Sequence, residues 1–186
     1  EADRKARPYF INVPKINIPI ESGDFITIKD KILKENFNRS ETILYMQNAY
    51  KEIVENNKEK YAEMFDVLLD KNNYPVLISS HLGKDRAGIA SALLLYALGV
   101  PEYIIEEDYL ASNNYIDPKK TITFSEPLTE SLQEAMTALF SANRAYLGFA
   151  FDYIRETYGS IDNYLEKEVR VSKGKTIILR KLMLYN

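Results

Sequence analysis

The stretch SSHLGKDRAG, residues 79–88, gathers the residue types that bind a doubly charged anion. The guanidinium of Arg86 is a planar fork that matches two phosphate oxygens at once. Gly83 and Gly88 permit backbone turns and a close anion approach that side chains would block. Ser80 stands at the head of this loop, where chemistry on a phosphate requires a strong nucleophile. The pattern therefore predicts a phosphate-binding loop with a weak nucleophile.

Two apolar segments flank the loop and are expected to position it. YPVLIS, residues 74–79, predicts a strand covered on both faces, and AGIASALLLYALG, residues 87–99, predicts a buried helix that Gly99 ends. A strand–loop–helix unit directs the loop N–H groups and the positive end of the helix at one point. An ATP-binding P-loop is excluded, because its required Gly and Ser/Thr positions hold Ile78 and Asp85.

The rest of the chain predicts a small sheet with many helices. One or two strands are expected at 9–20, and an exposed loop is expected at 116–127. Helical spacing or composition predicts helices at 27–37, across 40–73 with a break near 55–60, and at 101–114, 128–140, 142–159, 160–169 and 174–184. Ser40 and Ser160 are the expected N-caps of two of them.

Composition indicates one soluble globular domain, residues 1–186. The net charge of −3 argues against general attraction to nucleic acid, and the longest apolar run is too short for a membrane span. The absence of Cys excludes disulfides and thiolate metal sites, and a single His makes a His-based metal site or a Ser–His triad improbable. No signal peptide is visible, which slightly favours a cytoplasmic location, and no metal or other cofactor is expected. The oligomeric state stays open.

The loop and its surroundings resemble the tyrosine-phosphatase superfamily. The closest pattern is that of the bacterial and fungal branch whose loop reads H-C-x-x-G-K-D-R-[TA]-G. DYLASN at 108–113, the long segment at 143–169 and LRKLML at 179–184 resemble the C-terminal helices of that branch, and YFINVPKINIPI at 9–20 resembles its strand before the acid loop. The resemblance implies an α/β fold, a small central sheet flanked by many helices. It also implies that N-terminal strands of that fold should lie upstream of Glu1.

The resemblance implies hydrolysis of phosphate monoesters through a phosphocysteine, and here the chain departs from the pattern. The family's His-Cys pair is Ser79–Ser80 in this sequence. A Ser hydroxyl has no anionic population comparable to that of the family's thiolate, and no base is adjacent in the sequence. The chain is therefore expected to bind phosphate and scarcely to turn over.

Two origins of Ser80 stay open. A deliberate Cys→Ser replacement would trap substrate while the loop keeps its shape, and the difference of one heavy atom favours this origin. The alternative is a natural pseudophosphatase that binds a phosphorylated ligand, which Ser79 in place of His favours. The natural residue at position 80 would separate an enzyme from a binding module.

The resemblance also assigns roles to other positions. His81, Leu82, Gly83, Lys84, Asp85 and Arg86 are expected to bind the phosphate, with Ser80, Asp85 and Arg86 at the catalytic positions. Asp85 is either the general acid or an orienting group for Arg86 or water, or else it caps the following helix. Asp24, with Glu21 nearby, is a candidate general acid on a mobile loop. Expected partners are a phosphorylated protein or a phosphoinositide, the latter favoured if Lys84 and Lys119–Lys120 lie at the pocket.

Overall fold

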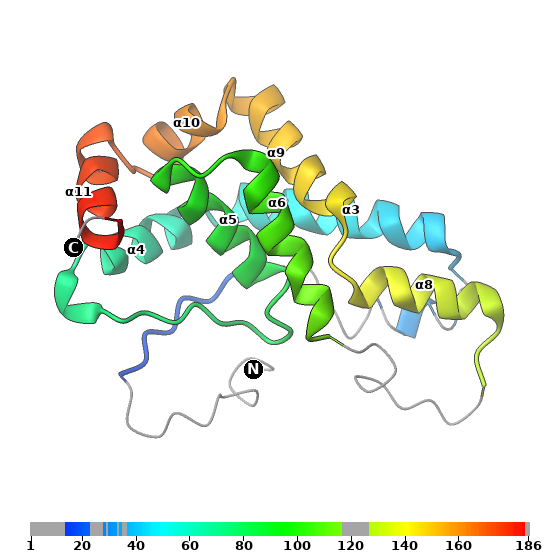
Figure 1. Ribbon diagram of the computed structural model, residues 1–186. Helices are drawn as coiled ribbons and strands as arrows, with labels where there is room; N and C mark the ends of the chain where they lie inside the picture. The colour runs from blue at the N-terminus through cyan, green and yellow to red at the C-terminus, as the bar shows by residue number, and fades with distance from the viewer. Residues whose placement is uncertain are drawn as a thin grey trace.

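The computed structural model describes residues 14–22, 37–116 and 127–184, together with Ile28, Asp30–Ile32 and Lys34. Within these ranges all regular secondary structure is helical (Figure 1). The described positions between 28 and 34 are helical as well, and Ile28 and Ile32, one turn apart, are both buried. The helix predicted at 27–37 is thus confirmed at those positions.

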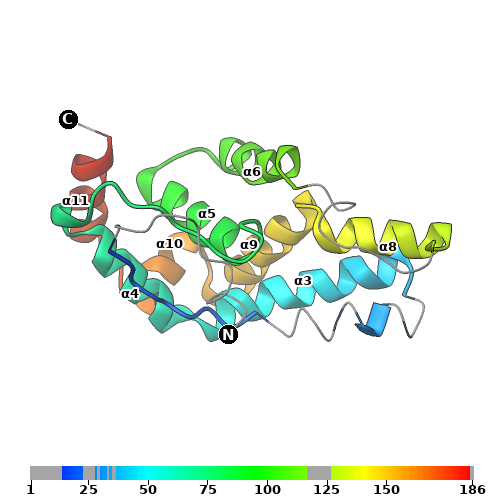
Figure 2. The same ribbon diagram turned by 90° about the horizontal axis from the view of Figure 1, so that it is seen from below.

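The long helix α3, Arg39–Asn56, lies at the centre of the helical packing. It makes its most extensive contacts with α8, Glu130–Phe140, and α9, Arg144–Tyr158. Both views show α8 beside the N-terminal half of α3 (Figures 1 and 2). The buried face of α3 repeats at helical spacing and consists of Thr42, Met46, Ala49, Tyr50, Ile53 and Val54.

Four further helices, α4, α5, α6 and α11, complete the helical packing. The apolar α5, Arg86–Leu98, contacts α3, α6 (Glu102–Ala111) and α11 (Lys173–Met183). Helix α11 lies at the same end as α4, Lys58–Leu68, and is joined to it by the ion pair of Lys175 with Asp66 at 2.6 Å (Figure 1). The shorter elements are η1 (Lys71–Asn73), η2 (Ser112–Asn114), α10 (Ile161–Asn163) and the π-helical turn η3 (Tyr164–Glu168).

Most predicted helices are confirmed, and their ends show how the sequence stops and starts them. The break predicted at 55–60 falls at Asn57, between α3 and α4. Gly99 ends α5 with φ of 88°, in the left-handed region that glycine favours, and Ser160 caps α10 as predicted. The N-cap predicted at Ser40 is wrong: Asn38 caps α3 through a capping box with Glu41.

The strand predicted at 74–79 is not observed in the described part of the chain. Residues 76–80 are irregular, and Leu77 is 66% exposed rather than covered on both faces. An apolar run forms a buried strand only where neighbouring strands supply hydrogen-bond partners, and no strand lies among the described residues. Residues 14–20, predicted as strand, are irregular too, while 1–13 and 117–126 lie outside the described residues. The predicted central sheet is therefore not seen in what the structure describes.

Helices that could cross a bilayer were also sought in the described ranges. None of them combines the necessary length with sufficient apolar character.

Two buried tyrosines of the core differ in how their hydroxyl groups are satisfied. Tyr164 donates to the carbonyl oxygen of Val54 at 2.5 Å. The hydroxyl of Tyr61 is fully buried and has no hydrogen-bond partner among the described residues. Burial raises the pKa of Tyr61, so its hydroxyl stays protonated. Comparing the two residues therefore measures how much a hydrogen bond from a buried hydroxyl contributes to the free energy of unfolding.

We expect opposite effects from Tyr61→Phe and Tyr164→Phe. The first removes an unsatisfied hydroxyl and should leave the free energy of unfolding unchanged or raise it by up to about 1 kcal/mol. The second removes a made hydrogen bond and should lower that free energy by about 1–2 kcal/mol. Urea denaturation measures both. An equal loss of stability in the two variants would contradict this account of Tyr61.

Candidate phosphate-binding site

The loop Ser80–Arg86 leads directly into the N-terminus of α5. Arg86 is the first residue of that helix, and its side chain is partly buried. The hydroxyl oxygen of Ser80 accepts a hydrogen bond from the backbone N–H of Ala87 at 3.3 Å. The oxygen at the proposed nucleophile position thus lies at the positive end of a helix, the environment that favours an anion.

Lys84 and Asp85 form a buried ion pair within the loop. The ammonium of Lys84 lies 2.6 Å from Oδ1 of Asp85, and the Lys84 side chain is 0% exposed. Asp85 occupies the N-cap position of α5 but makes no capping hydrogen bond with its side chain. The capping interpretation of Asp85 is therefore wrong, because its carboxylate turns inward to Lys84. In this placement Lys84 does not present its ammonium to solvent.

The inward-facing carboxylate of Asp85 also accepts from a residue that sequence reasoning missed. The hydroxyl of Tyr50, on α3, donates to Oδ1 of Asp85 at 2.7 Å. That hydroxyl is also 2.7 Å from the hydroxyl of Tyr109, on α6, which in turn accepts from the backbone N–H of Asn143 at 3.3 Å. In the sequence Tyr50 looks like one more apolar residue of a helical stripe, so no pattern signals this contact.

Both tyrosine hydroxyls are held in their protonated form. Burial, followed by the charge of Asp85, raises the pKa of Tyr50 well above its usual value. Burial likewise raises the pKa of Tyr109. Each side chain therefore remains an O–H donor across the pH range in which proteins work.

The two glycines of the loop region serve different purposes. Gly83 has φ of 76°, a left-handed conformation that L side chains rarely adopt, and a Cβ there would meet nothing within 4 Å. Gly88 lies inside α5, where a Cβ would come within 3.1 Å of the Tyr109 ring. The missing side chain at Gly88 therefore makes room for that ring, which sequence analysis did not anticipate.

The remaining predicted positions are distributed unevenly. His81 and Gly83 are exposed and Leu82 is partly buried, so this part of the loop faces outward. Glu21 is exposed, and both polar groups of its backbone bond to the side chain of Asn57, at 2.7 and 2.9 Å. Asp24 and Lys119–Lys120 lie outside the described residues.

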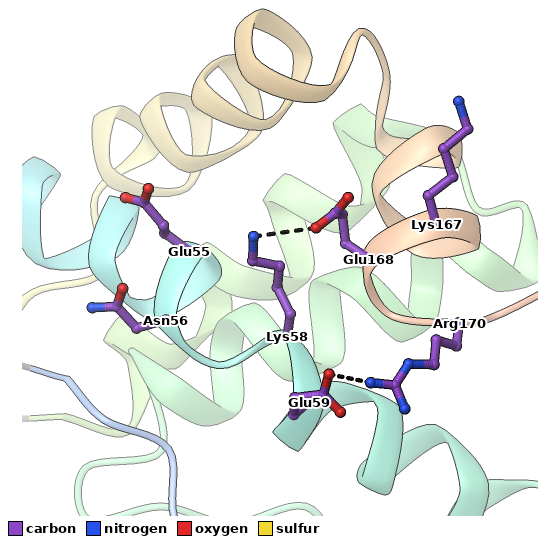
Figure 3. A pocket seen from close by; sticks show the side chains of 7 residues that line it. All are labelled: Glu55, Asn56, Lys58, Glu59, Lys167, Glu168 and Arg170. Carbon is purple, nitrogen blue, oxygen red and sulfur yellow. Dashed lines mark hydrogen bonds and ion pairs between the residues drawn. The ribbon is translucent and has the colours of Figure 1, made fainter.

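A separate pocket of about 340 Å³ opens between the end of α3, the start of α4 and η3 (Figure 3). Its lining residues are Glu55, Asn56, Lys58, Glu59, Lys167, Glu168 and Arg170. Lys58 points to Glu168 at 3.2 Å, and Arg170 pairs with Glu59. Acidic and basic groups in the pocket thus neutralise one another, and no residue of the Ser80–Arg86 loop lines it.

The described residues also offer no obvious metal centre. No group of three or more His, Asp or Glu side chains among them lies close enough together to hold a metal ion.

Known proteins resemble this chain over about half to three quarters of its length. PtpB of Mycobacterium tuberculosis, a triple specificity protein phosphatase, is 31% identical over 153 residues, which are 75% of this chain and 55% of PtpB. A protein of Cupriavidus necator, provisionally named a tyrosine-protein phosphatase, is 34% identical over 95 residues, 48% of this chain and 33% of its own length. The chain thus spans about half the length of PtpB and a third of the second relative.

The family comparison covers more of the chain than either relative. Residues 1–185 match the model of the tyrosine phosphatase family. The match includes the loop, the buried Lys84–Asp85 pair and both tyrosine-bearing helices. The chain accordingly belongs to the tyrosine phosphatase family.

Proposed function

We propose that the loop Ser80–Arg86 binds the phosphate group of a phosphorylated protein or a phosphoinositide, and that the chain is a phosphatase domain with Ser at the nucleophile position. The observation that carries the proposal is the hydrogen bond from the Ala87 N–H to the Ser80 hydroxyl. Ser80, the proposed nucleophile position, is thus bonded to the start of α5, the helix whose first residue is Arg86. Membership of the tyrosine phosphatase family supports a phosphorylated substrate.

Ser80 limits the chemistry at this site to binding or very slow turnover. A phosphocysteine mechanism requires a thiolate that attacks phosphorus, and the Ser hydroxyl remains un-ionised near neutral pH. The chain is therefore either a phosphatase whose nucleophile has been replaced or a natural pseudophosphatase that retains its ligand. The name of PtpB favours a phosphoprotein as the ligand, since PtpB is a protein phosphatase of more than one specificity.

Asp85 is proposed to anchor the loop rather than to act as the general acid. A general acid must offer a proton to the leaving oxygen, whereas Oδ1 of Asp85 already accepts from Lys84 and Tyr50. A carboxylate held by two donors keeps its neighbours in place and, through the backbone, orients Arg86, the next residue. The leaving-group proton is then left to another residue, for which Asp24 remains the proposed candidate.

Arg86→Ala tests the binding site. We expect the affinity for inorganic phosphate, measured by isothermal titration calorimetry, to fall at least a hundredfold, about 3 kcal/mol, because the dianion loses its bidentate donor. Arg144→Ala is a matched control, since Arg144 is likewise the first residue of a helix, α9, but pairs with Glu106 at the surface. Unchanged phosphate affinity in Arg86→Ala would remove the site assignment.

Ser80→Cys tests the chemistry. The helix N-terminus and Arg86 should lower the pKa of the new thiol, so this variant should hydrolyse an aryl phosphate in the presence of EDTA. The rate should rise with pH as the thiol ionises, and without His at position 79 its maximum should lie at a higher pH than in relatives that carry His-Cys. Ser79→Cys, which puts a thiol on the exposed neighbour, is the control and should be inactive. A Ser80→Cys protein that binds phosphate without turnover would favour the pseudophosphatase.

Asp85→Asn separates the anchor from the general acid. The substitution leaves the buried Lys84 ammonium without its carboxylate, so stability should fall by about 3 kcal/mol and phosphate affinity should fall in the Ser80 protein itself. A general acid acts only during turnover. If Asp85→Asn binds phosphate normally and slows only the Ser80→Cys enzyme, the anchoring role is wrong.

A further inference from the structure

We propose that Tyr50 and Tyr109 are positioning residues of the phosphate loop, which act through Asp85 to hold Ser80–Arg86 in its binding conformation. The inference rests on the proposed function, because it concerns the same loop. Neither tyrosine belongs to the loop, and neither is assigned to the site by the sequence motif. Tyr50 reaches Asp85, the N-cap of α5, from α3, and the ring of Tyr109 on α6 lies against Gly88 in the first turn of α5.

The hydrogen bonds that link Asn143, Tyr109, Tyr50 and Asp85 form a network, and the number of hydrogens available fixes which group donates in each bond. The hydroxyl of Tyr50 has one hydrogen, and Asp85 takes it, because an ionised carboxylate only accepts. The bond between the two tyrosine hydroxyls must therefore be donated by Tyr109. The oxygen of Tyr109 is then free to accept from the backbone N–H of Asn143, the N-cap of α9. Every donor in the series points toward the carboxylate.

A series of hydrogen bonds with one direction strengthens its members. Each donor polarises the next, so Tyr50 is a better donor to Asp85 when Tyr109 donates to it. Lys84 approaches the same carboxylate oxygen from within the loop, at 2.6 Å. Asp85 is thus bonded within its own loop to Lys84, directly to α3 through Tyr50, and indirectly to α6 through Tyr109.

The packing around the two rings leaves little room for the series to shift. Tyr50 is 0% and Tyr109 3% exposed, and their rings meet edge to face with centroids 6.2 Å apart. The Tyr109 ring also fills the space beside Gly88, in the first turn of α5. The same side chain therefore contacts the helix that carries Arg86 and supports the hydrogen bond to the loop.

The test measures binding of inorganic phosphate to the Ser80 protein by isothermal titration calorimetry, at a temperature where all variants are folded. Tyr50→Phe should weaken binding about tenfold, because the carboxylate loses a neutral donor to a charged acceptor. Tyr109→Phe should weaken it about threefold, since it removes only the support of Tyr50. The double variant should match Tyr50→Phe alone, because Tyr109 acts through Tyr50.

Two controls separate positioning from general destabilisation. Tyr164→Phe also loses a buried hydrogen bond, to Val54, but one that is remote from the network, and should bind phosphate like the parent. Tyr61→Phe loses a buried hydroxyl with no partner among the described residues, and should do the same. In ¹⁵N spectra, Tyr50→Phe and Tyr109→Phe should both shift the amide signals of Ser80–Arg86, while the controls should leave them in place.

The outcomes distinguish this inference from the proposed function. If the parent protein binds no phosphate, the proposed function fails before the tyrosines are tested. If the parent binds and Tyr50→Phe binds equally well, or if Tyr164→Phe weakens binding as much, the positioning role is overturned. Additive losses in the double variant would show two independent contacts and would overturn the directed series. Should Tyr50→Phe not fold, Tyr109→Phe and the amide shifts decide the matter.

Discussion

The arrangement of the loop depends on the interactions of one buried group, the carboxylate of Asp85, with Lys84 and Tyr50. Removing a carboxylate and an ammonium from water costs several kcal/mol per ion, and this cost is offset only by close pairing and further hydrogen bonds. Lys84 at 2.6 Å and Tyr50 at 2.7 Å satisfy that condition. Because the desolvated pair cannot be separated cheaply, Lys84 and Asp85 are held against α3 at the point where the loop enters α5.

The burial of apolar surface decides how the helices pack around the loop. Helix α5 is apolar nearly all round and is therefore buried, which places its N-terminus against α3 and α6. At that junction the polar ends of Tyr50 and Tyr109 would be costly to bury alone, and they satisfy one another and Asp85 instead. Core packing and the candidate site are thus built by the same side chains.

Membership of the tyrosine phosphatase family and the serine at position 80 bear on two different properties, phosphate binding and catalytic turnover. The family match and the position of the loop at the N-terminus of α5 both support the proposed binding of a phosphate group. In the proposed function, nucleophilic attack depends on the ionisation of the side chain at position 80, which is a hydroxyl group in this sequence. The proposed function therefore separates affinity from turnover, because the donors proposed to bind the anion are not the group at position 80.

The sequence by itself determined the loop, most of the helices and the family, because these depend on local signals. The spacing of Ser80 and Arg86, the positive φ at Gly83 and the end of α5 at Gly99 are encoded within a few residues. The strand predicted at 74–79 did not appear, since a strand requires partners that its own residues do not supply. Only the tertiary structure decided that Lys84 is buried, that Asp85 turns away from capping α5, and that Tyr50 donates to it. Those facts depend on α3 meeting the loop, where Tyr50 and Asp85 are 35 positions apart in the chain, and on α3 meeting α6, where Tyr50 and Tyr109 are 59 positions apart. No local pattern records such contacts.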